Sequence, residues 1–356
     1  MFRYFLIFFT LFNSVSLAQT SIGAETKLEK KARNWDTLKY QKFERVLILG
    51  LFQQVRTFNN EFNLVPRDSL SQHVYSAESN LTGGISFCFD KFQFSLATRN
   101  NPSNEGEGKG YTKMFNLGLS VGDNRWISET YFRRFTGFYD KNVRAYDSVA
   151  KITKYYLQPG MVNTIFMQRF MYFTNYKKYS FKSGFGCNYR QLKSAATFIL
   201  GSSFSVFDIQ NDSAILPMKA RAVYEDYGNM NGFTSVNIGV NGGIAATVVL
   251  FKAWFISGYF TVGPEQQWRN YSLGSADRKI SYISWSGTGR ASLGINLKRF
   301  YLLYSITNDY NLYNQKKSRT FSSNALTNNF TLGWRFHCKT PKFYQKFMKT
   351  KVYGFL

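Results

Sequence analysis

The 356-residue chain carries 45 Lys and Arg against 21 Asp and Glu, a formal net charge of +24, and it contains 36 Phe and 24 Tyr. Its mean hydropathy is nonetheless negative, at −0.29, so the apolar residues are dispersed along the chain. After the first 20 residues no run approaches the ~18 uninterrupted apolar residues of a membrane helix, which excludes a helical membrane protein and leaves strands for any bilayer crossing. The positive excess predicts attraction to anionic lipids, polysaccharides or solutes.

The N-terminus has the pattern of a secretory signal peptide. Met1 and Arg3 form a thin positive region, an apolar run follows from Phe5 to Phe12, and Ser16-Leu17-Ala18 is a small-x-small cleavage site. We predict a signal peptide over 1–18 whose removal lowers the formal charge from +24 to +23. Residues 19–42 are rich in both charge signs and are expected to form a partly helical periplasmic lead-in.

The stretch Lys178–Arg190 illustrates the pattern that recurs along the rest of the chain. Aromatic residues and Cys187 occupy alternate positions, and Gly, Ser, Asn, Lys and Arg fill the positions between them. A period of two predicts a strand. An aromatic face opposite a small, polar face is typical of a transmembrane barrel, with lipid outside and a wet lumen inside.

The same alternation predicts thirteen strands in chain order, at residues 46–53, 81–89, 92–97, 115–121, 126–133, 162–173, 178–190, 198–206, 236–244, 254–262, 283–297, 300–306 and 325–336. An odd number conflicts with the even strand count of bacterial single-chain barrels. The connection Gln191–Ser194 is also short on a rim that should carry long loops. We place the counting error in Thr57–Val65 or Leu216–Tyr227. The prediction is an all-β, transmembrane, antiparallel up-and-down barrel over 43–336, with twelve strands favoured and fourteen as the alternative, followed by a basic periplasmic tail over 337–356.

Four segments resemble a family of outer-membrane barrel proteins of the Bacteroidota that is defined as a domain of unknown function. They are Thr136–Tyr139, Tyr172–Ser180, Gln191–Ala195 and Gly333–Phe336, in the expected order along the chain. The resemblance implies an exported, membrane-embedded barrel of the Gram-negative envelope, and it implies no activity, substrate or catalytic residue. Barrels of this kind commonly end at the aromatic residue of the last strand, whereas this chain continues from Phe336 to Leu356.

Few residues suggest catalysis or metal binding. The two histidines are His73, in a predicted loop, and His337, after the last strand. A hydrolase acting on membrane lipids would need a serine and histidine pair near one rim, and His73 is the only reasonable base. Glu129 is expected to form an ion pair in the lumen with Arg133. Cys88, Cys187 and Cys338 are widely spaced and predict neither a disulfide framework nor a metal site.

Five basic residues are predicted to line the lumen: Arg133, Lys182, Arg190, Arg290 and Arg335. They fit either a narrow, porin-like channel that prefers small anionic solutes or a plugged lumen whose charges pair with loops or bind lipopolysaccharide phosphates. Nucleic acid is excluded because aromatic and basic residues occupy opposite faces. We therefore expect a monomeric, non-enzymatic outer-membrane barrel without a cofactor that contacts outer-membrane lipids and lipopolysaccharide. The alternatives are a lipid-modifying hydrolase and a soluble secreted β-sandwich.

Overall fold

The computed structural model describes residues 35–64, 70–99, 108–143, 155–186, 188–251, 253–274, 276–316 and 319–355. The predicted signal peptide, most of the predicted lead-in and Cys187 lie outside these ranges. Among the residues described, no helix is both long and apolar enough to cross a bilayer.

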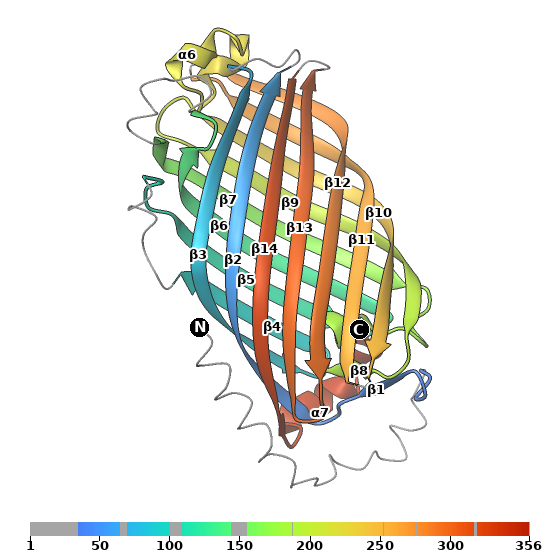
Figure 1. Ribbon diagram of the computed structural model, residues 1–356. Helices are drawn as coiled ribbons and strands as arrows, with labels where there is room; N and C mark the ends of the chain where they lie inside the picture. Colours follow the sequence, from blue (N-terminus) through green and yellow to red (C-terminus); the bar gives the residue numbers. More distant parts are fainter. Residues whose placement is uncertain are drawn as a thin grey trace.

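Twelve antiparallel strands form one closed barrel (Figure 1). They are β2 (Val46–Leu64), β3 (Gln72–Phe89), β4 (Phe92–Arg99), β5 (Lys113–Gly122), β6 (Trp126–Asp140), β7 (Tyr156–Phe173), β9 (Ala195–Gln210), β10 (Gly232–Leu250), β11 (Trp254–Ser272), β12 (Asp277–Asn296), β13 (Phe300–Lys316) and β14 (Arg319–His337). Each strand pairs with its successor, and β14 closes the ring on β2. The predicted all-β, up-and-down barrel of twelve strands is confirmed, and the alternatives of fourteen strands and of a sandwich are wrong.

The two rims of the barrel differ in their connections. Both ends of the described chain lie at one rim, here called the terminus rim, together with the short turns after β3, β5, β10 and β12 (Figure 1). Most connections at the distal rim are longer, and the connection of residues 211–231 contains α6 (Met218–Arg221) and the 3-10 helix η2 (Glu225–Asn229). The tail forms α7 (Lys342–Met348) and α8 (Lys351–Phe355) at the terminus rim.

The predicted strand Lys178–Arg190 does not exist, and it accounts for the surplus in the predicted strand count. Instead, residues 174–186 and 188–194, here called the plug, form α5 (Phe181–Phe185) and β8 (Tyr189–Gln191). β8 pairs with β1 (Tyr40–Lys42) in a separate two-stranded sheet. The two segments suspected of the counting error hold no further strand, since β2 continues to Leu64 and residues 216–227 contain α6 and part of η2.

Side-chain polarity inverts halfway along the strands. On β2 the outward face reads Leu47, Leu49, Leu51, Gln53 and Val55 from the terminus rim, and then Thr57, Asn59, Glu61 and Asn63. The inward face of β2 is apolar near the terminus rim at Val46, Ile48 and Phe52. It is polar near the middle, at Gln54 and Arg56, and apolar again at Phe58 and Phe62 near the distal rim. The alternation of burial persists along the whole strand, but the outward face changes from apolar in the terminus half to polar in the distal half. The expected wet lumen therefore does not extend along the whole barrel.

Other strands repeat this inversion. On β9 the outward face is mainly apolar from Phe198 to Val206, with Ser202 as the polar exception, and then polar at Asp208 and Gln210. Phe207 and Ile209 are fully buried inside. The distal half of the lumen is filled by a hydrophobic cluster that includes Phe58, Phe62, Phe135, Phe138, Phe207, Phe233, Tyr313 and Phe321. Residues 211–231 cover that cluster with Ile215, Leu216, Ala220, Tyr224, Tyr227 and Met230. The distal half is thus a barrel with a dry core, as in soluble proteins.

Candidate functional site

A layer of buried charges crosses the middle of the lumen. Arg133 on β6 donates to Asp309 Oδ2 on β13 at 2.8 Å, and Arg169 on β7 donates to Asp309 Oδ1 at 2.7 Å. β6 and β13 stand opposite one another in the ring. Because two cations share one carboxylate across the full width of the barrel, this layer holds the opposite walls together at its centre.

A second ion pair lies beside the first. Arg290 on β12 donates to Glu129 Oε1 on β6 at 3.2 Å and to the Tyr131 hydroxyl at 3.1 Å. The expected pair between Glu129 and Arg133 is therefore wrong, because each residue finds its partner across the lumen and not four residues along its own strand. Spacing along one strand could not show which opposite strand supplies the partner.

The remaining residues of the predicted lumen set lie nearer the terminus rim. Arg335 on β14 donates to Asn296 Oδ1 at 2.7 Å and lies 4.0 Å above the Phe43 ring. Lys182 and Arg190 are on the plug and not on the barrel wall. Lys182, with 2% of its surface exposed, donates to the carbonyls of Lys91 and Gly122. Arg133 and Arg290 thus lie in the middle layer and the other three lie nearer the terminus rim, so the five residues do not form one ring.

The plug is fixed to the inside of the wall. Phe181 packs against Tyr259 on β11 with ring centroids 5.4 Å apart, and Ser292 on β12 donates to the Gly184 carbonyl at 2.9 Å. Ser180 caps α5 by accepting from Ser183 N. Gln191 links the last part of the plug to its first part. Its Oε1 accepts from Ser180 N at 2.9 Å, and its Nε2 donates to the Lys178 carbonyl at 2.8 Å.

The turn between β3 and β4 joins the plug to β1 and to the helices of the C-terminal tail. The carboxylate of Asp90 accepts from Lys42 on β1 at 2.6 Å, from Tyr344 on α7 at 2.9 Å and from Tyr353 on α8 at 2.5 Å. Its carbonyl accepts from Asn188 on the plug at 2.5 Å. Burial raises the pKa of Asp90, but Lys42 and the two tyrosine hydroxyls outweigh burial and lower that pKa to about 2.

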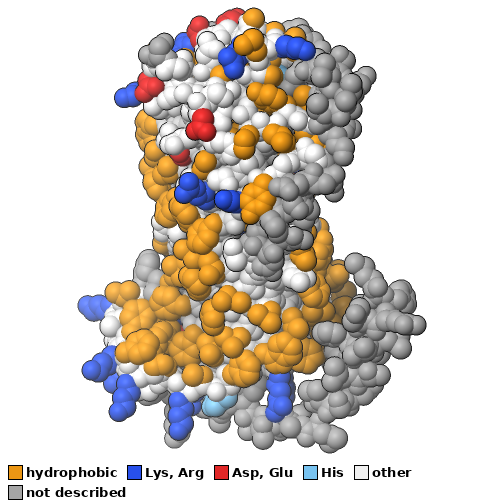
Figure 2. Space-filling view, turned by 90° about the vertical axis from the view of Figure 1, so that its left-hand side faces the viewer, with side chains coloured by type: hydrophobic (Ala, Val, Ile, Leu, Met, Phe, Trp, Pro, Cys, Tyr) orange, Lys and Arg blue, Asp and Glu red, His pale blue; other side chains and the backbone are white. Residues whose placement is uncertain are grey.

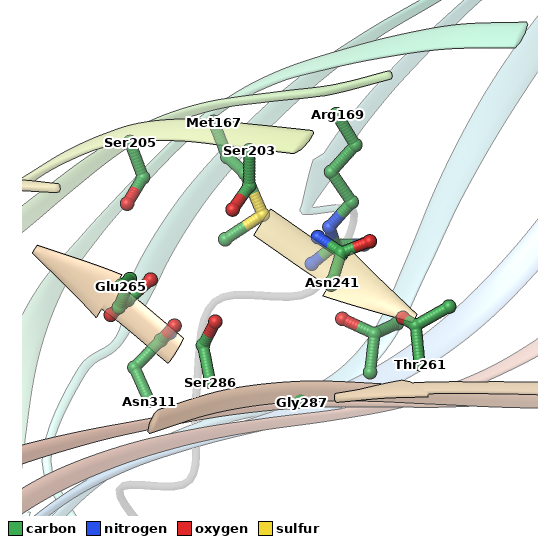
Figure 3. A pocket seen from close by; sticks show the side chains of 11 residues that line it. Met167, Arg169, Ser203, Ser205, Asn241, Thr261, Glu265, Ser286, Gly287 and Asn311 are labelled. Carbon is green, nitrogen blue, oxygen red and sulfur yellow. The ribbon is translucent and has the colours of Figure 1, made fainter. Parts of the chain in front are cut away.

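Among the described residues, cavities lie inside the barrel and at its terminus rim. A cavity of about 20 Å³, near the size of one water, is entered by Arg169 from β7, Asn241 from β10 and Glu265 from β11 (Figure 3). A second, of about 70 Å³, lies between the plug and the wall beside Lys182 and Arg290. A third, of about 410 Å³, lies at the terminus rim and is lined by Trp35, Tyr40, Lys42, Phe43, Glu44, Arg45, Phe89, Asp90, Lys91, Asp123, Asn124, Arg125, Tyr176, Tyr189, Thr340, Tyr344, Met348, Tyr353 and Gly354.

His73 lies on β3 in the distal half, with none of its surface exposed. Its Nδ1 is 3.0 Å from Asp140 Oδ2 and its Nε2 is 3.1 Å from the Leu70 carbonyl. Because Nε2 faces a carbonyl oxygen and the ring is buried, this geometry differs from that of a histidine that activates a serine. Within the described residues no group of three His, Cys, Asp or Glu side chains could hold a metal ion.

The most important residues missed by the sequence reasoning are Arg169 and Asp309. Asp309 lies three residues beyond the predicted end of its strand, which β13 continues to Lys316. Extending the alternation would have placed it on the inward face with Tyr301 and Leu303. Arg169 shares an inward face with Met167 and Met171, so that face has a mainly apolar appearance in the sequence.

A closed up-and-down barrel with a folded segment inside its lumen is thus the class of protein that these residues define. The chain belongs to the family described as Domain of unknown function (DUF4421), whose model matches residues 36–336. The family expected from the four segments is confirmed to that extent, and the assignment to the Bacteroidota stays a prediction. None of the curated proteins matches the chain.

Solved structures of low identity also match. The P. putida toluene transporter TodX is 6% identical over 82% of this chain and 91% of its own, with a TM-score of 0.27. The β domain of the Bordetella autotransporter BrkA is 11% identical over 80% and 99%, with a TM-score of 0.34. A Pseudomonas aeruginosa FadL homologue is 8% identical over 83% and 91%, with a TM-score of 0.26.

Proposed function

We propose that this chain is a monomeric outer-membrane barrel that acts as a non-enzymatic structural or binding component of the envelope, with a lumen closed to solutes. The observation that carries the proposal is the inversion of polarity along the strands. Hydrocarbon suits the outward face of the terminus half, and water suits the outward face of the distal half. Figure 2 agrees, because hydrophobic side chains form a dense band in its lower part and acidic side chains gather in its upper part.

Strand length supports the same placement. A transmembrane strand needs ~9–11 residues, whereas β2, β10 and β11 each have 19. We infer that only the terminus half is embedded, with its rim in the periplasm, and that the distal half projects from the cell surface. In this orientation Lys113 and Arg134, which are exposed on neighbouring strands just distal to Phe115 and Phe132, would meet lipopolysaccharide phosphates.

A closed lumen is favoured over an anion-preferring channel. Three separate barriers support it: the plug, the crossing pairs at Asp309 and the hydrophobic cluster of the distal half. Four of the five basic residues that suggested anion preference, Arg133, Lys182, Arg290 and Arg335, are hydrogen-bonded to other groups of the barrel or the plug, so they are unavailable to a passing solute.

Planar-bilayer recording on the refolded full chain tests the proposal. We expect the chain to insert without conductance steps, with insertion verified by protection of the terminus half from protease. Reproducible steps with anion preference would instead support the channel. A chain that stays soluble as a compact particle without detergent would contradict the membrane placement itself.

The hydrolase alternative has a separate test. Purified protein in bilayers is incubated with phospholipid and lipopolysaccharide, and released fatty acid is measured for the wild type and for His73→Gln. We expect equal background in both, because the His73 ring is buried between Asp140 and the Leu70 carbonyl. Activity that depends on His73 would show that the barrel is an enzyme.

A further inference from the structure

The C-terminal tail packs against the outside of the barrel wall. Tyr344 on α7 contacts Phe89 with ring centroids 5.0 Å apart, and Phe347 contacts Phe92 at 5.9 Å. Phe89 shares a strand face with Phe87, and Phe92 with Phe94, and both of those residues are exposed on the outer wall. The tail therefore lies at the base of the apolar band and not beneath the lumen alone.

The surface that the tail turns away from the barrel is both apolar and basic. Phe343 is 74% exposed, Val352 60% and Met348 38%. Five lysines of the same tail are exposed: Lys339, Lys342, Lys346, Lys349 and Lys351. Apolar side chains among lysines on a short helical segment are the signature of a peptide that lies in a membrane interface.

The tail is also continuous with the embedded wall. Its chain follows directly from β14, where Trp334 and Phe336 are exposed on the outer face at the terminus rim. The hydroxyls of Tyr344 and Tyr353 both donate to Asp90, so the tail is tied to the turn that ends β3. A segment fixed at this height has its free face level with the lipid headgroups.

Further exposed lysines extend the charge around the same rim. Lys177, Lys178 and Lys193 lie on the plug connection, and Lys298 lies on the turn between β12 and β13. Figure 2 shows basic side chains along the lower edge of the molecule, directly beneath the band of hydrophobic side chains. A basic collar at the edge of an apolar band matches the phosphate layer of a bilayer in both position and charge.

We propose that residues 338–355 are an interfacial anchor that binds the leaflet on the terminus-rim side, with Phe343 and Val352 inserted among the acyl chains and the lysines on the phosphates of anionic phospholipids. The partner is thus the surface of an anionic bilayer. This inference rests on the proposed membrane placement and deepens it by naming which lipid contacts the periplasmic rim.

Hydrogen exchange measured by mass spectrometry tests the anchor. The full chain is inserted into bilayers containing phosphatidylglycerol and into matched bilayers of phosphatidylcholine, and amide exchange is followed over residues 338–355. We expect exchange to be at least ~10-fold slower in the anionic bilayer, since each lysine near such a surface adds to binding. Replacing the five tail lysines by Gln should remove the difference, and Phe343→Ser should reduce protection in both bilayers.

The matched control replaces Lys219 and Lys279, two exposed lysines of the distal part, by Gln and should leave tail exchange unchanged. Equal exchange of the tail in the two bilayers, in a chain whose barrel strands are protected, would overturn the anchor and leave the proposed barrel intact. Failure of the barrel strands to become protected would overturn the membrane placement and the anchor together.

Discussion

Arg133 and Asp309 meet across the barrel at 2.8 Å, although 176 residues separate them in the sequence and their strands stand on opposite sides of the ring. With Arg169 on the other carboxylate oxygen, Asp309 pairs with two arginine side chains whose exposed fractions are 6% and 9%. Desolvation of these charges is offset only while all three remain together. The layer therefore makes the width of the lumen a fixed property of the fold.

Asp309→Asn should destabilise the folded barrel by roughly 3–5 kcal/mol, because two buried guanidinium groups lose their charge partner. Equilibrium denaturation in lipid or detergent measures the loss. Asp226→Asn is the matched control, since Asp226 pairs with Arg278 at 3.1 Å but is 67% exposed, and it should cost about 0–1 kcal/mol. Equal effects from the two substitutions would contradict a structural role for the crossing layer.

The strands of the barrel wall could be predicted from the sequence, whereas the residues that fill the lumen could not. Period-two alternation located every strand of the ring, because wall residues alternate whichever face is apolar. The inversion of polarity was missed for the same reason: Phe58 and Phe62 keep the alternation of Leu49 and Leu51 but belong to the opposite face. Only following one face along a whole strand distinguishes the two halves.

The plug has the alternating composition of a strand although it contains a helix. Phe181 and Phe185 are four residues apart, a helical spacing, yet Tyr179 and Tyr189 make the same stretch alternate. Because α5 has only five residues, its helical spacing is too short to be recognised within a stretch that alternates like a strand. The sequence did contain one useful signal: the short connection Gln191–Ser194 fell on a rim where long loops were expected. The structure explains this signal, because the segment that contains the plug connects β7 and β9 at the terminus rim, where the other connections are short turns.

Acid should release the C-terminal tail. Lys42 and the tyrosines hold the pKa of Asp90 at about 2, below its ordinary value of 3.8. A depressed carboxylate pKa contributes stability above the unfolded value, and this contribution is lost as pH falls through about 4 towards 2. The tail amides should therefore exchange faster in that pH range, by an amount that corresponds to a loss of up to about 2 kcal/mol in the free energy that holds the tail in place. In Asp90→Asn the tail should exchange fast at every pH, and an unchanged acid transition there would assign it to another group.

Removing the plug should leave the barrel sealed. Phe173 on β7 and Ile199 on β9 are register partners, so a short Gly-Ser turn can replace residues 177–194. The crossing pairs at Asp309 and the hydrophobic cluster still close the lumen above it. Single-channel recording should detect no steps, and a conducting variant would mean that the plug alone is the barrier.

The position of the membrane can be tested on a single strand. Leu200 and Gln210 both point outward on β9, with Leu200 in the apolar series and Gln210 at the distal end. Leu200→Arg places a charge in hydrocarbon and should cost up to ~2–4 kcal/mol, whereas Gln210→Arg should be nearly neutral because its side chain stays in water. Folding titrations into bilayers give both values under one set of conditions. Similar costs at the two positions would mean that lipid surrounds the whole height of the barrel, and near-neutral values at both would mean that neither position touches hydrocarbon. A higher cost for Leu200→Arg than for Gln210→Arg requires a barrel that is embedded only by its terminus half. The two positions lie on the same face of the same strand and receive the same new side chain, so they differ mainly in their height along the barrel.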